Sequence, residues 1–163
     1  MERIEHTIAP FFRSDSRVLI LGTMPSPKSR ESGFYYGHPR NRFFPVLSDV
    51  FGEPAPMTVP ERMAFLERHR IALWDVLRSC EITGASDASI RNPVPNDIGM
   101  ILRSADIRKI FTTGTAAFRL YRELLLPDTE AEAELLPSPS PANARLSQAD
   151  LAARYSVIRR YTE

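Results

Sequence analysis

The chain has 163 residues, of which 43% are hydrophobic and 25% are charged, and its net charge is +1. The length fits one domain over 1–163, and the composition argues against intrinsic disorder. A single cysteine, Cys80, excludes an internal disulfide, a four-cysteine zinc site and an iron–sulfur cluster. No apolar run approaches the ~20 residues that cross a bilayer, and the N-terminus lacks the apolar core of a signal peptide. We therefore expect a soluble, cytoplasmic protein that does not bind membranes.

The first predicted element is a short helix over 4–12 that covers a sheet. A run of β-branched and other apolar residues at 17–22 ends in Gly22 and predicts the first strand. The segment 23–40 that follows is long and rich in proline, glycine and aromatic residues. Loops of that length inside compact domains are usually functional, so we expect this one to carry part of a site.

Two helices are predicted next. The first covers 41–51, because apolar residues recur there at helical spacing, and Gly52 ends it. The second covers 60–70, with Met63 and Leu66 facing the core.

The second half of the chain alternates strands with helices. In chain order we expect a strand at 71–76, a loop at 80–95, a helix to 104 that Asn96 or Asp97 caps, a strand at 107–113, a helix over 115–126, a short strand at 134–136 and a last helix over 147–161. Such alternation predicts right-handed βαβ units. The expected fold class is thus α/β: a three-layer α/β/α sandwich with a short central parallel sheet of about four strands.

Proline-rich loops follow two of the predicted strands, with Pro25 and Pro27 after the first and Pro137, Pro139 and Pro141 after the last. In a parallel sheet, ligands bind at the carboxyl ends of the strands. Both loops leave such ends, so we expect them to meet at one site.

Familiar enzyme motifs are absent. The chain has no phosphate-binding loop, no G-x-G-x-x-G and no G-x-S-x-G. The three histidines, His6, His38 and His69, do not have the spacing of metal ligands. We therefore expect neither a metal nor a cofactor.

Aromatic and basic residues are interleaved in the run Phe34-Tyr35-Tyr36-Gly37-His38-Pro39-Arg40-Asn41-Arg42-Phe43-Phe44. Aromatic rings beside arginines, just before a helix, suit stacking on a flat base with phosphates nearby. The spacing of the two phenylalanines also fits the core, and the two tyrosines fit either role. Of the 21 basic residues only Lys28 and Lys109 are lysines, and all the others are arginines. Arginine suits contacts with phosphates and base edges better than lysine does, although a GC-rich genome explains the same bias.

Three segments together resemble the active-site motifs of the uracil-DNA glycosylase superfamily, and most of all its hypoxanthine (deoxyinosine) DNA glycosylase branch. They are Gly22-Thr23-Met24-Pro25, the aromatic run from Phe34 to Phe44, and Leu136-Pro137-Ser138-Pro139-Ser140-Pro141-Ala142-Asn143. The resemblance implies hydrolysis of the N-glycosidic bond of a deaminated base that is flipped out of double-stranded or single-stranded DNA. It implies a monomer that needs no metal, cofactor or iron–sulfur cluster.

The resemblance also implies roles for individual residues. It assigns catalysis to Asn41, whose amide can hold a water through its oxygen and donate through its nitrogen. Asparagine at this position is equally typical of a helix cap. The implied base-binding residues are Tyr36, Gly22, Met24, Phe44 and His38, with Tyr36 as the stacking aromatic. The implied DNA-binding residues are Ser138, Ser140, Asn143, Arg145 and Arg40.

Two positions depart from the better-known branches. Met24 stands where many relatives have Asp or Asn, and Leu136 where several have His or Asn. Hypoxanthine is the base that the branch implies. The alternatives are a uracil or mismatch-specific DNA glycosylase, and a catalytically silent module that binds nucleic acid or nucleotides.

Overall fold

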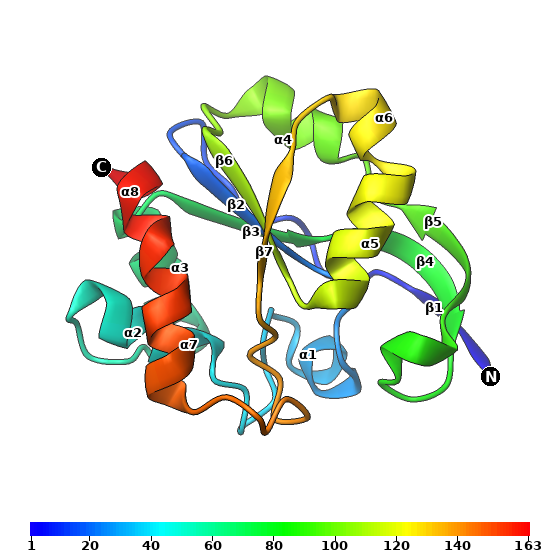
Figure 1. Cartoon of the computed structure of the whole chain (residues 1–163), viewed down its shortest axis with the longest axis horizontal. Coiled ribbons are helices and arrows are strands. Elements are labelled where there is room, and N and C mark those ends of the chain that lie inside the picture. Colours follow the sequence, from blue (N-terminus) through cyan, green and yellow to red (C-terminus); the bar gives the residue numbers. More distant parts are fainter.

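Four parallel strands form the central sheet of the computed structural model, which describes residues 1–163 (Figure 1). In spatial order they are β3 (Ile71–Asp75), β2 (Val18–Gly22), β6 (Lys109–Thr113) and β7 (Ala133–Leu136). All five residues of β2 are buried, because neighbouring strands flank it and both faces of the sheet are covered. The structure confirms the predicted α/β sandwich and its four short strands.

Alternate residues of β2 point into two separate hydrophobic cores. Val18 and Ile20 face the core that holds α2 (Phe43–Phe51), α3 (Val59–Arg68) and α7 (Gln148–Tyr155). Leu19 and Leu21 face the core that holds α4 (Ile98–Ser104) and α5 (Thr115–Leu124). The short elements α6 (Leu126–Thr129), η2 (Ser156–Ile158) and α8 (Arg159–Thr162) complete these two layers.

Local signals fix several helix ends where the sequence predicts them. Gly52 ends α2 in the left-handed conformation. Asp97 rather than Asn96 caps α4, by accepting the Met100 N–H. Ser147 and Asp150 form a capping box at the start of α7.

The predicted helix over 4–12 and the predicted loop over 80–95 are both wrong. Instead β1 (Glu2–Glu5), β4 (Leu77–Ile82) and β5 (Arg91–Pro95) form a second, antiparallel sheet in the order β1-β4-β5. The physical reason is that β1 gains its hydrogen bonds only from β4, far along the chain. In addition, the polar residues of β4 weaken its apolar pattern.

Two smaller differences concern helices. The segment predicted as a continuous loop over 23–40 contains the short helix α1 (Pro27–Ser32), which Ser26 caps and Gly33 ends. In α3, Leu66 is fully buried as predicted, but Met63 is 37% exposed and faces solvent. None of the helices has the length and apolar character that a membrane-spanning segment requires.

The burial difference within α3 predicts a difference in stability. We expect Leu66→Ala to lower the free energy of unfolding by about 2–5 kcal/mol, because it leaves a cavity in the core. We expect Met63→Ala to change it by less than about 0.5 kcal/mol. Urea unfolding of both variants measures the two values, and equal losses would contradict this assignment of the buried face.

Candidate active site

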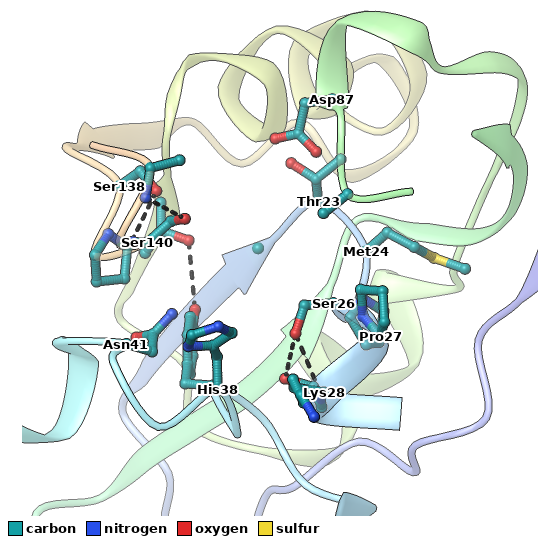
Figure 2. A pocket seen from close by; sticks show the side chains of 18 of the residues that line it. Thr23, Met24, Ser26, Pro27, Lys28, His38, Asn41, Asp87, Ser138 and Ser140 are labelled. Carbon is teal, nitrogen blue, oxygen red and sulfur yellow. Dashed lines mark hydrogen bonds between the residues drawn. The ribbon is translucent and has the colours of Figure 1, made fainter. Parts of the chain in front are cut away.

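A cavity of about 460 Å³ opens at the carboxyl ends of the central strands (Figure 2). Its walls come from the loop after β2, the aromatic run that precedes α2, and the proline-rich loop after β7. The loop between β4 and β5, which contains the 3₁₀ turn η1 (Asp87–Ser89), forms the remaining wall. The predicted meeting of the two proline-rich loops is therefore observed, and the cavity has the size of a small-molecule site.

Gly22, the last residue of β2, forms the floor of this cavity. A Cβ atom at this position would lie 2.6 Å from Asp75 Oδ1, 3.6 Å from Thr113 Oγ1 and 3.7 Å from the Tyr36 hydroxyl. The absence of a side chain at Gly22 thus lets three polar side chains converge on one point.

Tyr36 lines the cavity from a strained backbone position, with a φ of 54°. Its ring stacks on Phe43, with 3.8 Å between the ring centroids and 12° between the planes. Its hydroxyl is 3.3 Å from Thr113 Oγ1. Burial and the nearby Asp75 carboxylate hold the pKa of Tyr36 well above its ordinary value. The hydroxyl therefore stays protonated, and one face of the ring is already covered.

Asn41 faces the cavity and immediately precedes Arg42, which is the N-cap residue of α2. Asn41 Oδ1 accepts the N–H of Phe43, the first residue of the helix, at 2.9 Å, which fixes the orientation of the amide. The side-chain nitrogen, Nδ2, points into the cavity and donates to no protein acceptor (Figure 2). The contact with the start of α2 and the cavity-facing position thus use different atoms of one side chain.

His38 lines the cavity beside Asn41 (Figure 2). Its Nδ1 accepts the Arg40 N–H at 3.0 Å, so in the neutral ring the proton sits on Nε2. Arg40 itself is exposed and lies outside the cavity wall.

Ser138 and Ser140 face the cavity from the opposite wall (Figure 2). Each hydroxyl oxygen accepts a backbone N–H two residues ahead, at 3.1 Å and 3.2 Å respectively. Both hydroxyl hydrogens therefore remain free to donate. Asn143 is not part of this wall; its Nδ2 donates to the Ser138 carbonyl at 2.9 Å and braces the loop. Arg145 is exposed beside a second hollow.

Arg42 ties the two loops together. Its guanidinium donates to the carbonyl oxygens of Asn143 and Leu146, and its backbone N–H donates to the Pro139 carbonyl at 3.0 Å. This side chain thus holds loops that are about a hundred residues apart in sequence.

Two of the apolar positions do not line the cavity, and the third lines it with an apolar side chain. Met24 is part of the cavity wall, but its partly buried side chain extends away from Asn41 and Ser138 and packs against the core on the α5 side (Figure 2). Leu136 is buried in the other core. Phe44 is also buried, under the guanidinium of Arg62 at 4.7 Å, and it does not line the cavity.

Sequence reasoning missed Asp75, Thr113 and Asp87 as lining residues. Asp75 and Thr113 are the last residues of β3 and β6. Because ligands bind at the carboxyl ends of parallel strands, the argument that predicted a site at the proline-rich loops applies to these two residues as well. Asp87 comes from the second sheet, which the sequence did not reveal. Desolvation, and then the charge of Asp75, raise the pKa of Asp87, while Thr23 opposes that shift.

The chemistry available here is that of hydrogen bonding and stacking. The cavity offers the carboxylates of Asp75 and Asp87, the ammonium group of Lys28, several hydroxyl groups, an amide donor and an aromatic ring. The His, Cys, Asp and Glu side chains form no group of three or more that could hold a metal ion.

Comparison with known proteins agrees with this architecture. The family model described as the uracil DNA glycosylase superfamily matches residues 9–159. A hypoxanthine DNA glycosylase from Methanosarcina acetivorans is 33% identical over 136 residues, which are 82% of this chain and 85% of that protein. A hypoxanthine DNA glycosylase from Methanosarcina barkeri is 30% identical, over 83% and 86% of the two chains.

A solved structure is similar over almost the whole fold. It is a solution structure of a candidate uracil DNA glycosylase from Methanosarcina acetivorans, with a TM-score of 0.82 and 28% identity. The match covers 98% of this chain and 99% of that one. Sequence and fold lead to the same conclusion: the chain belongs to the uracil DNA glycosylase superfamily.

Proposed function

We propose that this protein is a DNA glycosylase that removes hypoxanthine from deoxyinosine by hydrolysis of the N-glycosidic bond. The observation that carries the proposal is the Asn41 amide, which directs a free N–H donor into the cavity, whereas Met24 and Leu136 have apolar side chains that cannot donate. Two relatives that carry the name hypoxanthine DNA glycosylase support the choice of base. We further propose that it acts as a cytoplasmic monomer on double-stranded or single-stranded DNA.

The reaction breaks the bond between C1′ of the sugar and N9 of the base, and the electron pair goes to the base. Water then bonds to C1′ of the oxocarbenium-like sugar and loses a proton. Negative charge develops on the departing base, so a preorganised donor aimed at it lowers the barrier. Asn41 supplies such a donor through Nδ2, because its Oδ1 is held by the Phe43 N–H.

Stacking and backbone contacts complete the proposed site. The flipped base stacks on the face of Tyr36 opposite Phe43, which supports the ring from behind. The hydroxyls of Ser138 and Ser140, His38 and the exposed Arg145 contact the sugar–phosphate backbone.

Duplexes that carry a single hypoxanthine, uracil or xanthine residue test the proposal directly. After incubation with the protein, alkali cleaves any abasic site. We expect strand breaks at hypoxanthine first. Faster release of uracil would instead indicate a uracil or mismatch-specific enzyme. Binding without breaks would indicate a silent module, which the apolar side chains of Met24 and Leu136 favour.

Two substitutions separate the two functions of Asn41. We expect Asn41→Ala to lower single-turnover release of hypoxanthine by roughly 10²–10³, as the loss of one preorganised donor does. We also expect it to cost about 1 kcal/mol of stability, because the Phe43 N–H loses its hydrogen bond to Oδ1. Asn41→Asp keeps the acceptor for the Phe43 N–H, so it is expected to unfold like the wild type. Its activity should be no higher than that of Asn41→Ala, because it replaces the donor with negative charge. High activity of Asn41→Asp would show that an oxygen, not Nδ2, is required.

Tyr36 is expected to act through its ring. Tyr36→Ala should weaken productive binding of hypoxanthine DNA by roughly 1–3 kcal/mol, which is the value of one base–aromatic stack. Tyr36→Phe keeps the ring on Phe43 and should have a small effect. Titration of the single-turnover rate with enzyme concentration measures both. If the two variants lose equally, the hydroxyl and not the ring face is the important group.

Backbone contacts should appear in the salt dependence of binding. If Arg145 contacts a phosphate, Arg145→Ala should reduce the slope of log affinity against log salt by about 0.9 on duplex DNA. Arg108→Ala is the matched control. Arg108 is also exposed, but it directly precedes β6 and so lies at the amino ends of the parallel strands, whereas the cavity lies at their carboxyl ends. An unchanged slope for Arg145→Ala would remove this loop from the DNA interface.

A further inference from the structure

Hydrolysis of the N-glycosidic bond takes a proton from the attacking water, and neither Asn41 nor Tyr36 can accept it. Asn41 Oδ1 already accepts the Phe43 N–H, and Nδ2 can only donate. The Tyr36 hydroxyl stays protonated, because burial and the Asp75 carboxylate hold its pKa well above the ordinary value. A group that takes the proton must therefore come from another part of the cavity.

Few of the side chains that line the cavity can act as a base. His38 is the only imidazole among them. Its Nδ1 accepts the Arg40 N–H at 3.0 Å and its Nε2 carries the ring proton, so neither nitrogen offers a lone pair. The remaining candidates are the carboxylates of Asp75 and Asp87.

Asp75 lies too deep to reach the sugar. It ends β3 at the floor of the cavity, where it is 5% exposed, and its Oδ2 accepts the Nε2–H of His6 at 2.8 Å. A flipped nucleotide stays bonded to the DNA backbone, so its base fills the depth of the cavity and its sugar remains at the mouth. The base therefore separates Asp75 from C1′.

Asp87 lies at the mouth instead. It belongs to η1 in the loop between β4 and β5, and it lines the cavity although the residue is exposed. Figure 2 shows its carboxyl group directed toward the side chain of Thr23, the residue that follows the floor position Gly22. A water at the mouth can thus contact this carboxylate while the base occupies the floor.

The turn that carries Asp87 is fixed by its own hydrogen bonds. Ser89 Oγ accepts the Thr83 N–H at 2.8 Å and donates to the Ser86 carbonyl at 2.6 Å. Ile90, which follows the turn, packs against the core on the α5 side. The carboxylate is therefore in place before DNA binds, as a preorganised catalytic group must be.

The surroundings of Asp87 suit a group that exchanges protons. Desolvation by the cavity wall, and then the charge of Asp75, raise its pKa; the Thr23 hydroxyl opposes this shift, and no basic side chain does. Two other ionisable groups lie nearby. The Lys28 ammonium lines the same cavity, and burial and then the Asp87 charge raise the pKa of the Cys80 thiol. A carboxylate is a better general base when its pKa lies closer to the working pH.

We infer that Asp87 is the general base that accepts the proton of the attacking water; this inference rests on the proposed function. The C1′–N9 bond breaks and its electron pair goes to the base, whose developing charge Asn41 stabilises. An electron pair of the water oxygen bonds to C1′, and one proton passes from that water to the Asp87 carboxylate. Asp87 then gives the proton to solvent, and the base anion takes one from solvent.

Asp87→Asn keeps the shape of the side chain but cannot accept a proton. We expect it to lower single-turnover release of hypoxanthine by roughly 10²–10⁴, the usual contribution of general acid–base catalysis. Affinity for DNA with an abasic site should be unchanged. Asp128→Asn is the matched control, because Asp128 is also an exposed carboxylate but lies in α6 and does not line the cavity. It should retain the rate of the wild type.

Two further readouts separate catalysis from a structural role. The single-turnover rate of the wild type should fall as the pH falls through the pKa of Asp87, because the protonated carboxyl group cannot accept a proton. Since that pKa is raised, the fall should begin above the range of an ordinary carboxylate, and Asp87→Asn should lack it. Asp87→Ala leaves room for a small carboxylate, so added formate should restore part of its rate.

A wild-type rate in Asp87→Asn, or an acid limb that persists in this variant, would overturn the inference. So would a slow Asp87→Ala variant that has lost affinity for abasic DNA and does not respond to formate, because the role of Asp87 would then be structural. If Asp87→Asn does not fold, the wild type decides, and a rate that stays constant as the pH falls would overturn the inference. A wild type that releases no hypoxanthine at any pH contradicts the proposed function instead.

Discussion

The hydrogen bonds of Arg42 are the constraint on which the site depends. A parallel sheet brings the ends of β2 and β7 to the same edge, but it does not fix the loops that leave them. Arg42 does so by donating to three carbonyl groups of the second loop, from its guanidinium and from its backbone N–H. Because Asn41 and Phe43 flank Arg42, the same contacts set the Asn41 amide and the Tyr36–Phe43 stack opposite Ser138 and Ser140.

The two apolar departures from the familiar motifs follow from where those residues pack. Met24 packs against the core on the α5 side while it also lines the cavity, and Leu136 belongs to the core on the α7 side. Neither side chain brings a polar group to the cavity. Polar groups come instead from Asn41 on one wall and from Asp75 on the floor. In our account Asn41 assists departure of the base.

The sequence predicted the features that depend on local signals. Short apolar runs that end in glycine or proline marked the central strands, and Gly52, Asp97 and Ser147 marked helix ends. The second sheet could not be predicted in this way, because β1 and β4 are some seventy residues apart and their pairing has no local sign. Asp87 was missed for the same reason.

Predictions for the site succeeded and failed for related reasons. Motif resemblance drew attention to Asn41 and Tyr36, and both line the cavity. Asp75 was missed because one acidic residue after an apolar strand forms no motif until its strand is placed beside β2. The two interpretations of Asn41, as a residue that supports the start of α2 and as a functional residue, are compatible, because Oδ1 accepts the Phe43 N–H and Nδ2 faces the cavity.

A structure of the protein bound to DNA that carries a non-hydrolysable deoxyinosine analogue tests the central claim most directly. The account predicts that the hypoxanthine ring lies on Tyr36, with Asn41 Nδ2 within hydrogen-bond distance of the base. A base that remains stacked in the duplex, or that enters the cavity without contact to Asn41 Nδ2, would contradict it.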